Sequence, residues 1–483
     1  MGIDGKAGGE LTPLYRRLPY GPKRIEREEV ARNQRARLYG AMIEAVHQRG
    51  YPGTTVAHVI ALAGVSRRAF YEQFRNKEHC FLATYDIVVA RQRKLVIDSC
   101  NGEQGWTNRL HAGCKSLLDD VATDPKGARL VLVEALAVGS PARERMHLAG
   151  LAFERLLASV FAIAPEEAAL PPLAPRAVVG AVRQIVLLRV LEGRQTELRL
   201  LTDEVIDWIE SYRSPAAARL GAGARSAGPA SRSGPAPSRS GAIASGSGPA
   251  PSRSGAIASG SGATPPPSGA AAEEPAGRAA FLQGDGERSR ALRSLVDLTL
   301  GEGYARVSEV QLARRAGISV GTFHEHFSDT GQCLLAALDE FFGEALAAAR
   351  DALERGTAWP QAVDSAMRAF VGHLVADPAL LRIAFVDLFE LGPGIVGRLA
   401  GWVEAFIGLL TKAGPPPRRG PALALEAVTG AIWAVIATYV AGDRPARLPA
   451  LTEQLTFLVL APYIGPKAAI EAIQQTGMQP RAA

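Results

Sequence analysis

The eleven residues GVSRRAFYEQF, from Gly64 to Phe74, combine a turn signal with the start of a short helix. Gly64 can end a preceding helix in the left-handed conformation, and Ser66 can cap the next helix. Phe70 and Phe74 lie four residues apart, so they share one helical face and are predicted to pack inward. The outward face of the same helix carries Arg67, Arg68 and Tyr71.

Two more helices are predicted immediately before this stretch. The first has an apolar face and ends at Gly50. The second can be capped by Thr54 or Thr55 and continues to Ala63. Two short helices joined through a glycine turn form a helix-turn-helix unit, whose second helix enters the major groove of DNA. Because arginine can pair with guanine or neutralise a phosphate, this segment predicts DNA binding.

The same framework occurs a second time as GISVGTFHEHF, residues 317–327, in which the glycine, the serine and both phenylalanines recur at an offset of 253 positions. Trp106 recurs as Trp359 at the same offset, and GAVRQIV from Gly180 matches GAIWAVI from Gly430 at an offset of 250. Strand-like alternation is scarce in both halves. The sequence therefore predicts an all-α protein in which one helical fold is duplicated.

The segment between the halves has a different composition. Residues 214–279 are almost entirely Gly, Ala, Ser, Pro and Arg, and GPAPSRSGAIASGS stands in tandem at 234–247 and 248–261. So few large apolar side chains cannot offset the entropy lost on ordering. This segment is predicted to be a disordered linker.

Length and composition narrow the class of protein. A chain of 483 residues is too long for one ordinary core, so at least two domains are expected. Its four cysteines form no CxxC pair and no secretory segment opens the chain, which predicts a cytoplasmic location. Two apolar stretches, 178–191 and 423–440, contain charged residues, so buried helices are favoured over membrane spans and no membrane partner is expected.

The segment RGYPGTTVAHVIALAGVSRRAFYEQFRNKEHCF, residues 49–81, resembles the DNA-binding segment of TetR-type (tetracycline-repressor-like) transcriptional regulators. A looser resemblance covers residues 287–340. The resemblance implies a transcriptional regulator that acts as a repressor. It also implies a larger helical domain after each DNA-binding unit. That domain would hold a small apolar or amphipathic effector, and its last two helices would form a four-helix dimer interface.

The resemblance also implies roles for individual residues in binding double-stranded DNA. Thr54 or Thr55 would contact a phosphate of the DNA, and Arg67 and Arg68 would reach base edges or phosphates. Tyr71 and Gln73 would contact the DNA backbone. Lys77 would hold a phosphate, and the capped helix beginning at Ser66 would offer its N–H groups. The weaker positions of the second half are Ser319, Thr322, His324 and His326.

Charge separates the two units. Residues 1–80 contain 14 Lys and Arg against 8 Asp and Glu, whereas residues 278–335 contain 7 of each. The arginine pair and the lysine of the first unit have no counterpart in the second. Since each phosphate contact contributes to affinity and salt dependence, the second unit is expected to bind DNA weakly or not at all.

The predicted domains follow from these observations. They are a flexible basic leader (1–25), a first helix-turn-helix domain (26–80), a first helical ligand-binding and dimerisation domain (81–213), the linker (214–279), a second, degenerate helix-turn-helix domain (280–333), a second helical ligand-binding and dimerisation domain (334–466) and a tail (467–483).

Catalytic and metal chemistry find no support in the sequence. It contains no P-loop, GxSxG, HExxH or dinucleotide-binding motif, so neither an enzyme nor a cofactor is expected. His324 and His326 are two residues apart on a predicted helix and point in different directions, so no metal site is expected.

Two arrangements of the halves remain open. In an intramolecular pseudo-dimer, helices 176–192 and 196–213 would pack against 421–441 and 448–462. In a homodimer of chains, the first halves would pair with each other and present two arginine-bearing units. In either arrangement the second half could have lost DNA reading and serve only as an interaction or dimerisation module.

Overall fold

The computed structural model describes residues 27–220, 279–356, 358–387, 395–412, 414–418, 423–442 and 444–478. Within these ranges the chain is helical and forms no strand, which confirms the all-α prediction. The predicted leader and linker residues 221–278 lie outside the described residues.

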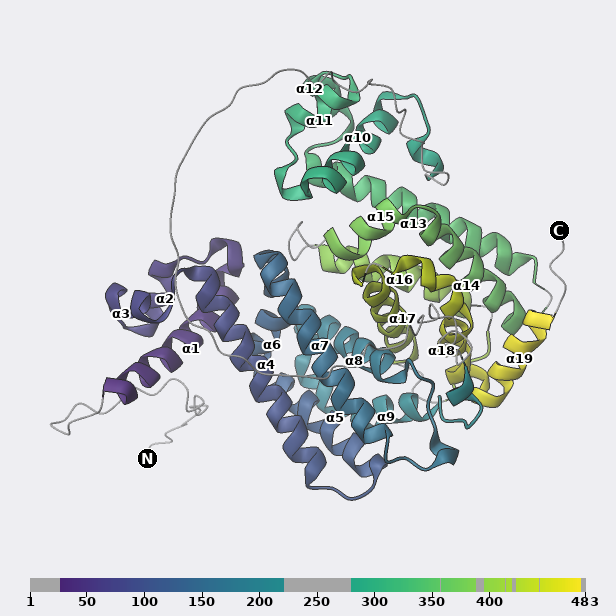
Figure 1. Ribbon diagram of the computed structural model, residues 1–483, viewed down its shortest axis with the longest axis horizontal. Helices are drawn as coiled ribbons and strands as arrows, with labels where there is room; N and C mark the ends of the chain where they lie inside the picture. The colour runs from purple at the N-terminus through teal and green to yellow at the C-terminus, as the bar shows by residue number, and fades with distance from the viewer. Residues whose placement is uncertain are drawn as a thin grey trace, which may run out of the picture.

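The described part of the first half contains nine α-helices (Figure 1). We call residues 27–74 the first head and residues 77–220 the first body. The helices of the head are α1 (Arg27–Gly53), α2 (Val56–Ala63) and α3 (Arg67–Gln73). Those of the body are α4 (Lys77–Asn101), α5 (Trp106–Thr123), α6 (Pro125–Leu132), α7 (Ser140–Phe161), α8 (Ala174–Leu191) and α9 (Thr202–Glu210).

The described part of the second half contains ten α-helices. We call residues 287–327 the second head and residues 330–478 the second body. The helices of the head are α10 (Glu287–Glu302), α11 (Glu309–Ala316) and α12 (Val320–His326). Those of the body are α13 (Thr330–Glu354), α14 (Trp359–Ala376), α15 (Pro378–Arg382), α16 (Ile395–Thr411), α17 (Ala424–Ala441), α18 (Thr452–Ile464) and α19 (Pro466–Met478).

The first head is held together by the side chains that the sequence predicted to face inward. Phe70 and Phe74 from α3 are buried against Leu38 and Met42 from α1. The same apolar cluster includes Leu130 of α6, so the head packs directly on its own body. Because a buried Phe contributes about 3–5 kcal/mol relative to Ala, α3 has one stable orientation on α1 and α2.

The two halves lie against each other along α8 and α17 (Figure 1). A Cβ atom added to Gly180 would lie 2.3 Å from the Cβ of Ala434 and 2.5 Å from the carbonyl oxygen of Gly430. A Cβ added to Gly430 would lie 2.6 Å from the carbonyl oxygen of Gly180. The two glycines therefore allow the helix backbones to approach more closely than any side chain would permit.

Polar contacts reinforce the junction between the halves. Arg189 of α8 places Nη1 2.9 Å from an Oε atom of Glu426 at the start of α17. Further along, the hydroxyl of Tyr212 donates to the carbonyl oxygen of Leu458 at 2.9 Å. These contacts join the helices that the sequence predicted to meet across a pseudo-dimer.

The structure corrects two predicted boundaries. Residues 214–220 pack on the protein: the buried Leu220 offers its carbonyl oxygen to the side-chain amide of Gln454 at 3.2 Å. The predicted tail 467–483 contains most of helix α19, whose Ile470 and Ile473 are buried. Both segments carry buried apolar side chains: Leu220 belongs to the core beside Gln454, and α19 packs on α14 and α18.

One helix, α17, is long and apolar enough to cross a membrane among the described residues. Here it is the partner of α8, and Val428, Ile432 and Val435 are buried in the shared core. The structure therefore places this apolar helix in the protein interior.

Candidate nucleic-acid interface and ligand cavity

The helix-turn-helix of the first head is organised by local hydrogen bonds. Thr55 caps α2, accepting from the backbone N–H of His58 while the His58 ring accepts from the N–H of Thr55, both at 3.3 Å. Gly64 ends α2 with φ 58° and ψ 41°, in the left-handed region that favours glycine. Ser66 then caps α3 by accepting from the N–H of Ala69. This geometry sets the direction of α3 relative to α2.

Arg37 of α1 fastens the turn from the other side. Its guanidinium donates to the carbonyl oxygens of Ala63 and Gly64, the second at 2.8 Å. These oxygens lie at the C-terminal end of α2, where the helix leaves carbonyl groups without internal partners. Arg37 was not among the predicted site residues, and it stabilises the turn on which the interface depends.

The outward face of α3 carries the predicted reading residues. Arg67, Arg68 and Tyr71 are exposed, Tyr71 with 47% of its surface accessible. Arg68 pairs with Glu72 at 2.9 Å, and the Arg67 guanidinium lies 5.8 Å from the centre of the Tyr71 ring. The three side chains thus form one edge that a DNA groove could receive.

Three predicted contact residues are engaged within the protein. Thr54 is 1% exposed, and its hydroxyl donates to the carbonyl oxygen of Gly50 at 2.8 Å. The predicted phosphate contact by Thr54 is therefore corrected to a structural role, whereas Thr55 lies on the surface. Gln73 accepts two hydrogen bonds from Arg35. Lys77 donates to the carbonyl oxygen of Tyr51 at 2.9 Å, and partial burial lowers the pKa of its ammonium group.

The second head has the same helix-turn-helix geometry with different chemistry. Ser319 caps α12, and its hydroxyl also lies 3.0 Å from that of Thr322. His324 lies 3.2 Å from a carboxylate oxygen of Glu309, and the His326 ring lies beside that of Phe327. The predicted weak contact residues of this head are therefore largely occupied by their neighbours.

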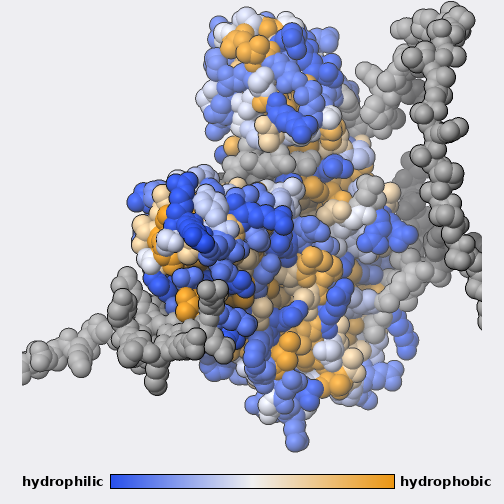
Figure 2. Space-filling model, turned by 60° about the vertical axis from the view of Figure 1, so that its left-hand side comes forward, coloured by the Kyte–Doolittle hydropathy of each residue, from blue (hydrophilic) through white to orange (hydrophobic). Residues whose placement is uncertain are grey.

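The two heads also differ in surface character. Figure 2 shows a mostly hydrophilic surface over both heads, interrupted by small apolar areas. The exposed side chains of the second head include Val310, 66% accessible, and Val320, 37% accessible. Val320 follows the cap of α12 directly, where the first head has Arg67.

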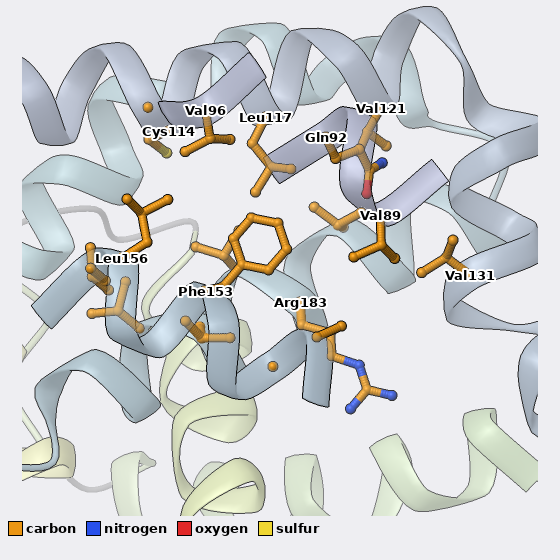
Figure 3. A pocket seen from close by; sticks show the side chains of 18 of the residues that line it. Val89, Gln92, Val96, Cys114, Leu117, Val121, Val131, Phe153, Leu156 and Arg183 are labelled. Atoms are coloured by element: carbon orange, nitrogen blue, oxygen red, sulfur yellow. The ribbon is translucent and has the colours of Figure 1, made fainter. Parts of the chain in front are cut away.

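A cavity of about 190 Å³ lies inside the first body, between α4, α5, α7 and α8 (Figure 3). Its walls are almost entirely apolar, and Phe153 of α7 projects into the centre of the view. Such concave apolar sites with few polar groups are typical of small-molecule binding. The labelled lining residues are Val89, Gln92, Val96, Cys114, Leu117, Val121, Val131, Phe153, Leu156 and Arg183.

A second cavity of about 370 Å³ lies where α7 and α8 face the second half. Its lining includes Arg176, Thr429 and Trp433, and it is more polar than the first. Arg183 of α8 lines both cavities, and so does Gly150 of α7. The two cavities therefore adjoin along these two helices.

A chain of contacts connects the first head to the first body. The backbone N–H of Tyr51 donates to Oε2 of Glu134 at 2.9 Å, and the other carboxylate oxygen of Glu134 lies 3.3 Å from Arg129. Glu134 is 2% exposed and belongs to the turn after α6, a helix that contributes Val131 to the cavity wall. The carbonyl oxygen of Tyr51 also accepts a hydrogen bond from Lys77. Tyr51 therefore links the end of α1 in the head with the cavity wall of the body.

The sequence did not predict functional roles for Arg35, Arg37, Glu134 or Arg183. Arg35, Arg37 and Glu134 each act through a partner that is distant in sequence, and Arg183 lines a cavity formed by several helices, so no local spacing reveals these roles. For Glu134 a weak signal existed, because the second half carries Asp387 at the matching position.

Metal binding finds no site in the part of the chain that the structure describes. No group of three or more His, Cys, Asp or Glu side chains is placed to hold an ion there. The buried thiols of Cys80 and Cys333 have pKa values raised to about 12 by burial, so neither is a ready nucleophile.

The family model described as "Bacterial regulatory proteins, tetR family" matches residues 41–84. These residues span the end of α1, all of α2 and α3, and the start of α4. The match confirms the resemblance for the DNA-binding segment of the first half. No curated protein matches the chain.

Several solved structures match part of the chain. The transcriptional regulator FadR from Bacillus subtilis, in complex with stearoyl-CoA, is 17% identical, covers 36% of this chain and 97% of its own, with a TM-score of 0.34. A TetR-like regulator from Rhodococcus sp. RHA1 is 17% identical, covers 39% of this chain and 96% of its own, with a TM-score of 0.32. RolR in complex with resorcinol is 18% identical, covers 41% of this chain and 96% of its own, with a TM-score of 0.30.

Proposed function

We propose that this protein is a cytoplasmic, non-enzymatic transcription regulator that binds double-stranded DNA through its first head and responds to a small molecule bound in its first body. The observation that carries the proposal is the exposed edge of Arg67, Arg68 and Tyr71 on α3. That edge lies in the segment that matches the tetR-family model. We further propose repression as its mode of action, because binding at an operator excludes other proteins from that DNA.

Several contacts support α3 as the reading helix. Phe70 and Phe74 fix its inner face, Arg37 fixes the turn before it, and Gln73 is tied to Arg35 of α1. A rigidly held helix loses little entropy when it enters the groove. Arg67, which has no ion pair among the described residues, is available for a guanine edge or a phosphate.

The same contacts separate the proposed DNA residues into two groups. Thr55, Ser66, Arg67, Arg68 and Tyr71 lie exposed on the head. Gln73 and Lys77 already have partners in the free protein, so a phosphate contact by either requires its present hydrogen bond to be exchanged. We propose the first group as the DNA contacts and the second as supports of the helix.

We propose that the second half is a degenerate copy of the first and pairs with it inside one chain. Support comes from the order of the helices, since a three-helix head precedes a longer helical body in each half. Gly180 and Gly430, which correspond in sequence, also meet at the contact of α8 with α17. In this pseudo-dimer, α8 and α9 take the place of one subunit's terminal helices and α17 and α18 that of the other.

A second candidate role concerns the second head alone. Its formal charge is zero over residues 278–335, its His324 pairs with Glu309, and Val310 and Val320 are exposed. A helix-turn-helix surface with these properties has less positive charge for phosphates than the first head. We propose that the second half completes the fold of the regulator and contributes little to DNA binding.

The test of the proposed function is selection of bound fragments from a random duplex DNA pool by the full-length chain, followed by footprinting. We expect a single protected half-site or an asymmetric site, with affinity that falls steeply as salt rises. Absence of any enriched sequence, with binding equal for all duplexes, would contradict sequence-specific regulation.

A further inference from the structure

Arg183 lines the cavity of the first body, is exposed to solvent, and has no hydrogen-bond or ion-pair partner among the described residues. Arg183 stands on α8, and Figure 3 shows its aliphatic stem beside the apolar lining and its guanidinium directed away from Phe153. No hydrogen bond or ion pair joins this guanidinium to any described side chain or carbonyl group. Nearby protein lowers the pKa of Arg183 by desolvation, but the side chain is still exposed to solvent and arginine keeps its proton in such settings.

Three other arginines near Arg183 are already engaged. Arg176 pairs with Glu154 at 3.1 Å, and Arg189, two turns further along α8, pairs with Glu426. Arg109, the other arginine of the cavity lining, donates to the carbonyl oxygen of Glu103 at 3.1 Å. Arg183 is therefore the lining arginine that the described protein leaves without an anionic or carbonyl partner.

The hydroxyl of Tyr85 belongs to the same site. Tyr85 lines the cavity, is 2% exposed and interacts electrostatically with Arg183. Burial raises the pKa of this phenol, so the hydroxyl stays neutral and cannot neutralise the guanidinium. A neutral hydroxyl beside an arginine can donate a second hydrogen bond to a bound anion.

We propose that the cavity binds an amphipathic anion, with an apolar chain against the walls around Phe153 and a carboxylate or phosphate group on Arg183. This inference rests on the proposed function, because it names the chemical class of the small molecule to which the regulator responds. A guanidinium without a protein partner beside an apolar cavity favours anions over neutral and cationic ligands of the same chain length, because an anion forms the strongest charge-assisted hydrogen bonds with it.

The position of the anion also connects the ligand to the junction of the halves. Arg183 lies on α8 three residues after Gly180, and it also lines the second cavity together with Trp433 of α17. A bound head group on Arg183 is thus placed beside the crossing of α8 and α17. A ligand that favours one position of α8 would shift the arrangement of the two halves, and with it the first head.

Titration calorimetry on the full-length chain tests the proposal with four decyl probes, namely decanoate, decyl phosphate, decanol and decyltrimethylammonium. We expect at least one of the two anions to bind about tenfold or more tightly than decanol, with the cation weakest. The stronger of the two anions identifies whether a carboxylate or a phosphate source is preferred.

Variants locate the effect. Arg183→Met keeps the apolar stem and should reduce the anion to the affinity of decanol, whereas Arg183→Lys should retain part of the preference. Gly150→Leu should weaken all the probes, because a side chain at this position enters open space in the cavity and its Cβ meets no atom within 4 Å. Circular dichroism confirms that each variant is folded.

Two results would overturn the inference: equal binding of decanol and both anions, or an anion preference that survives Arg183→Met. Absence of binding by every probe would overturn it as well. DNA binding by the wild-type chain is measured separately on the selected site. If the chain shows no preference for anions but binds DNA sequence-specifically, only this inference is rejected. If the chain prefers anions but does not bind DNA sequence-specifically, only the proposed function is rejected.

Discussion

Arg67 and Arg68 are neighbours on α3 but differ in their state in the free protein. Arg68 is paired with Glu72, although 90% of its side chain is accessible, and such an exposed pair contributes little to stability. Arg67 has no carboxylate partner among the described residues and lies near the Tyr71 ring. DNA binding therefore requires an ion pair to be exchanged at Arg68 but not at Arg67.

We expect Arg67→Ala to weaken binding to the selected DNA site by about 1–3 kcal/mol if Arg67 reads a base, and to lower the salt slope by about one unit if it holds a phosphate. Arg68→Ala should cost less, since its charge is partly compensated by Glu72. Arg155→Ala, on the exposed surface of α7, is the control for loss of one positive charge. If both α3 variants had the same affinity and salt slope as Arg155→Ala, the assignment of Arg67 and Arg68 as DNA contacts would be rejected.

At the scale of elements, the head is coupled to the body through a few buried groups. Glu134 accepts from the N–H of Tyr51 and pairs with Arg129, while Lys77 from α4 holds the carbonyl oxygen of Tyr51. Both backbone groups of Tyr51 are thus satisfied by side chains of the body. The turn after α6 is therefore linked directly to the end of α1.

Replacement of Glu134 by Ala should lower the free energy of unfolding by about 1–3 kcal/mol, because it leaves the N–H of Tyr51 without its acceptor in a partly buried place. Amide hydrogen exchange at Tyr51 should become faster. Glu144→Ala, at an exposed position of α7, is the matched control and should change neither quantity. Unchanged exchange at Tyr51 in the Glu134 variant would show that this hydrogen bond does not hold the head.

The crossing of α8 and α17 is the second decisive element contact. Gly180→Leu should separate the helices, because even its Cβ would lie 2.3 Å from the Cβ of Ala434. We expect a larger radius of gyration by small-angle X-ray scattering and a lower melting temperature. Gly150→Ala in α7, whose Cβ meets open space, should leave both unchanged or raise stability by up to about 1 kcal/mol. Compact scattering from the Gly180→Leu variant would contradict the close crossing.

At the scale of the whole molecule, the pseudo-dimer and the homodimer use the same helices. The faces of α8 and α9 that a second chain would need are covered by α17 and by the region around Leu458. Because both halves belong to one chain, their pairing is intramolecular, with an effective concentration that can reach about the millimolar range. Pairing within one chain is therefore favoured over pairing between chains.

Light scattering at nanomolar to micromolar concentration should give the mass of one chain, 51.0 kDa, and footprinting should protect an asymmetric site. The reason is that each molecule presents one arginine-bearing head and one neutral head. A mass of two chains together with a symmetric footprint would instead establish a homodimer with two arginine-bearing heads about one helical turn of DNA apart.

Local signals in the sequence are sufficient to predict the heads. The turn at Gly64, the caps at Thr55 and Ser66 and the inward pair Phe70 and Phe74 depend on interactions within a few residues, so the sequence itself carries them. The internal repeat likewise predicted which helices of the two halves correspond. The exact boundaries were less predictable, since α19 packs on α14 and α18, and residues 214–220 contact the second body, through groups that are distant in sequence.

Which of these residues have partners depends on tertiary packing alone. Thr54 and Thr55 are equal candidates in the sequence, but the fold buries the first and exposes the second. In the sequence Glu134 and Arg183 look like ordinary charges of helices, yet one is buried and holds the head, and the other lines a cavity without a protein partner among the described residues. The physical reason is that burial and pairing depend on groups distant in sequence, which only the packed chain brings together.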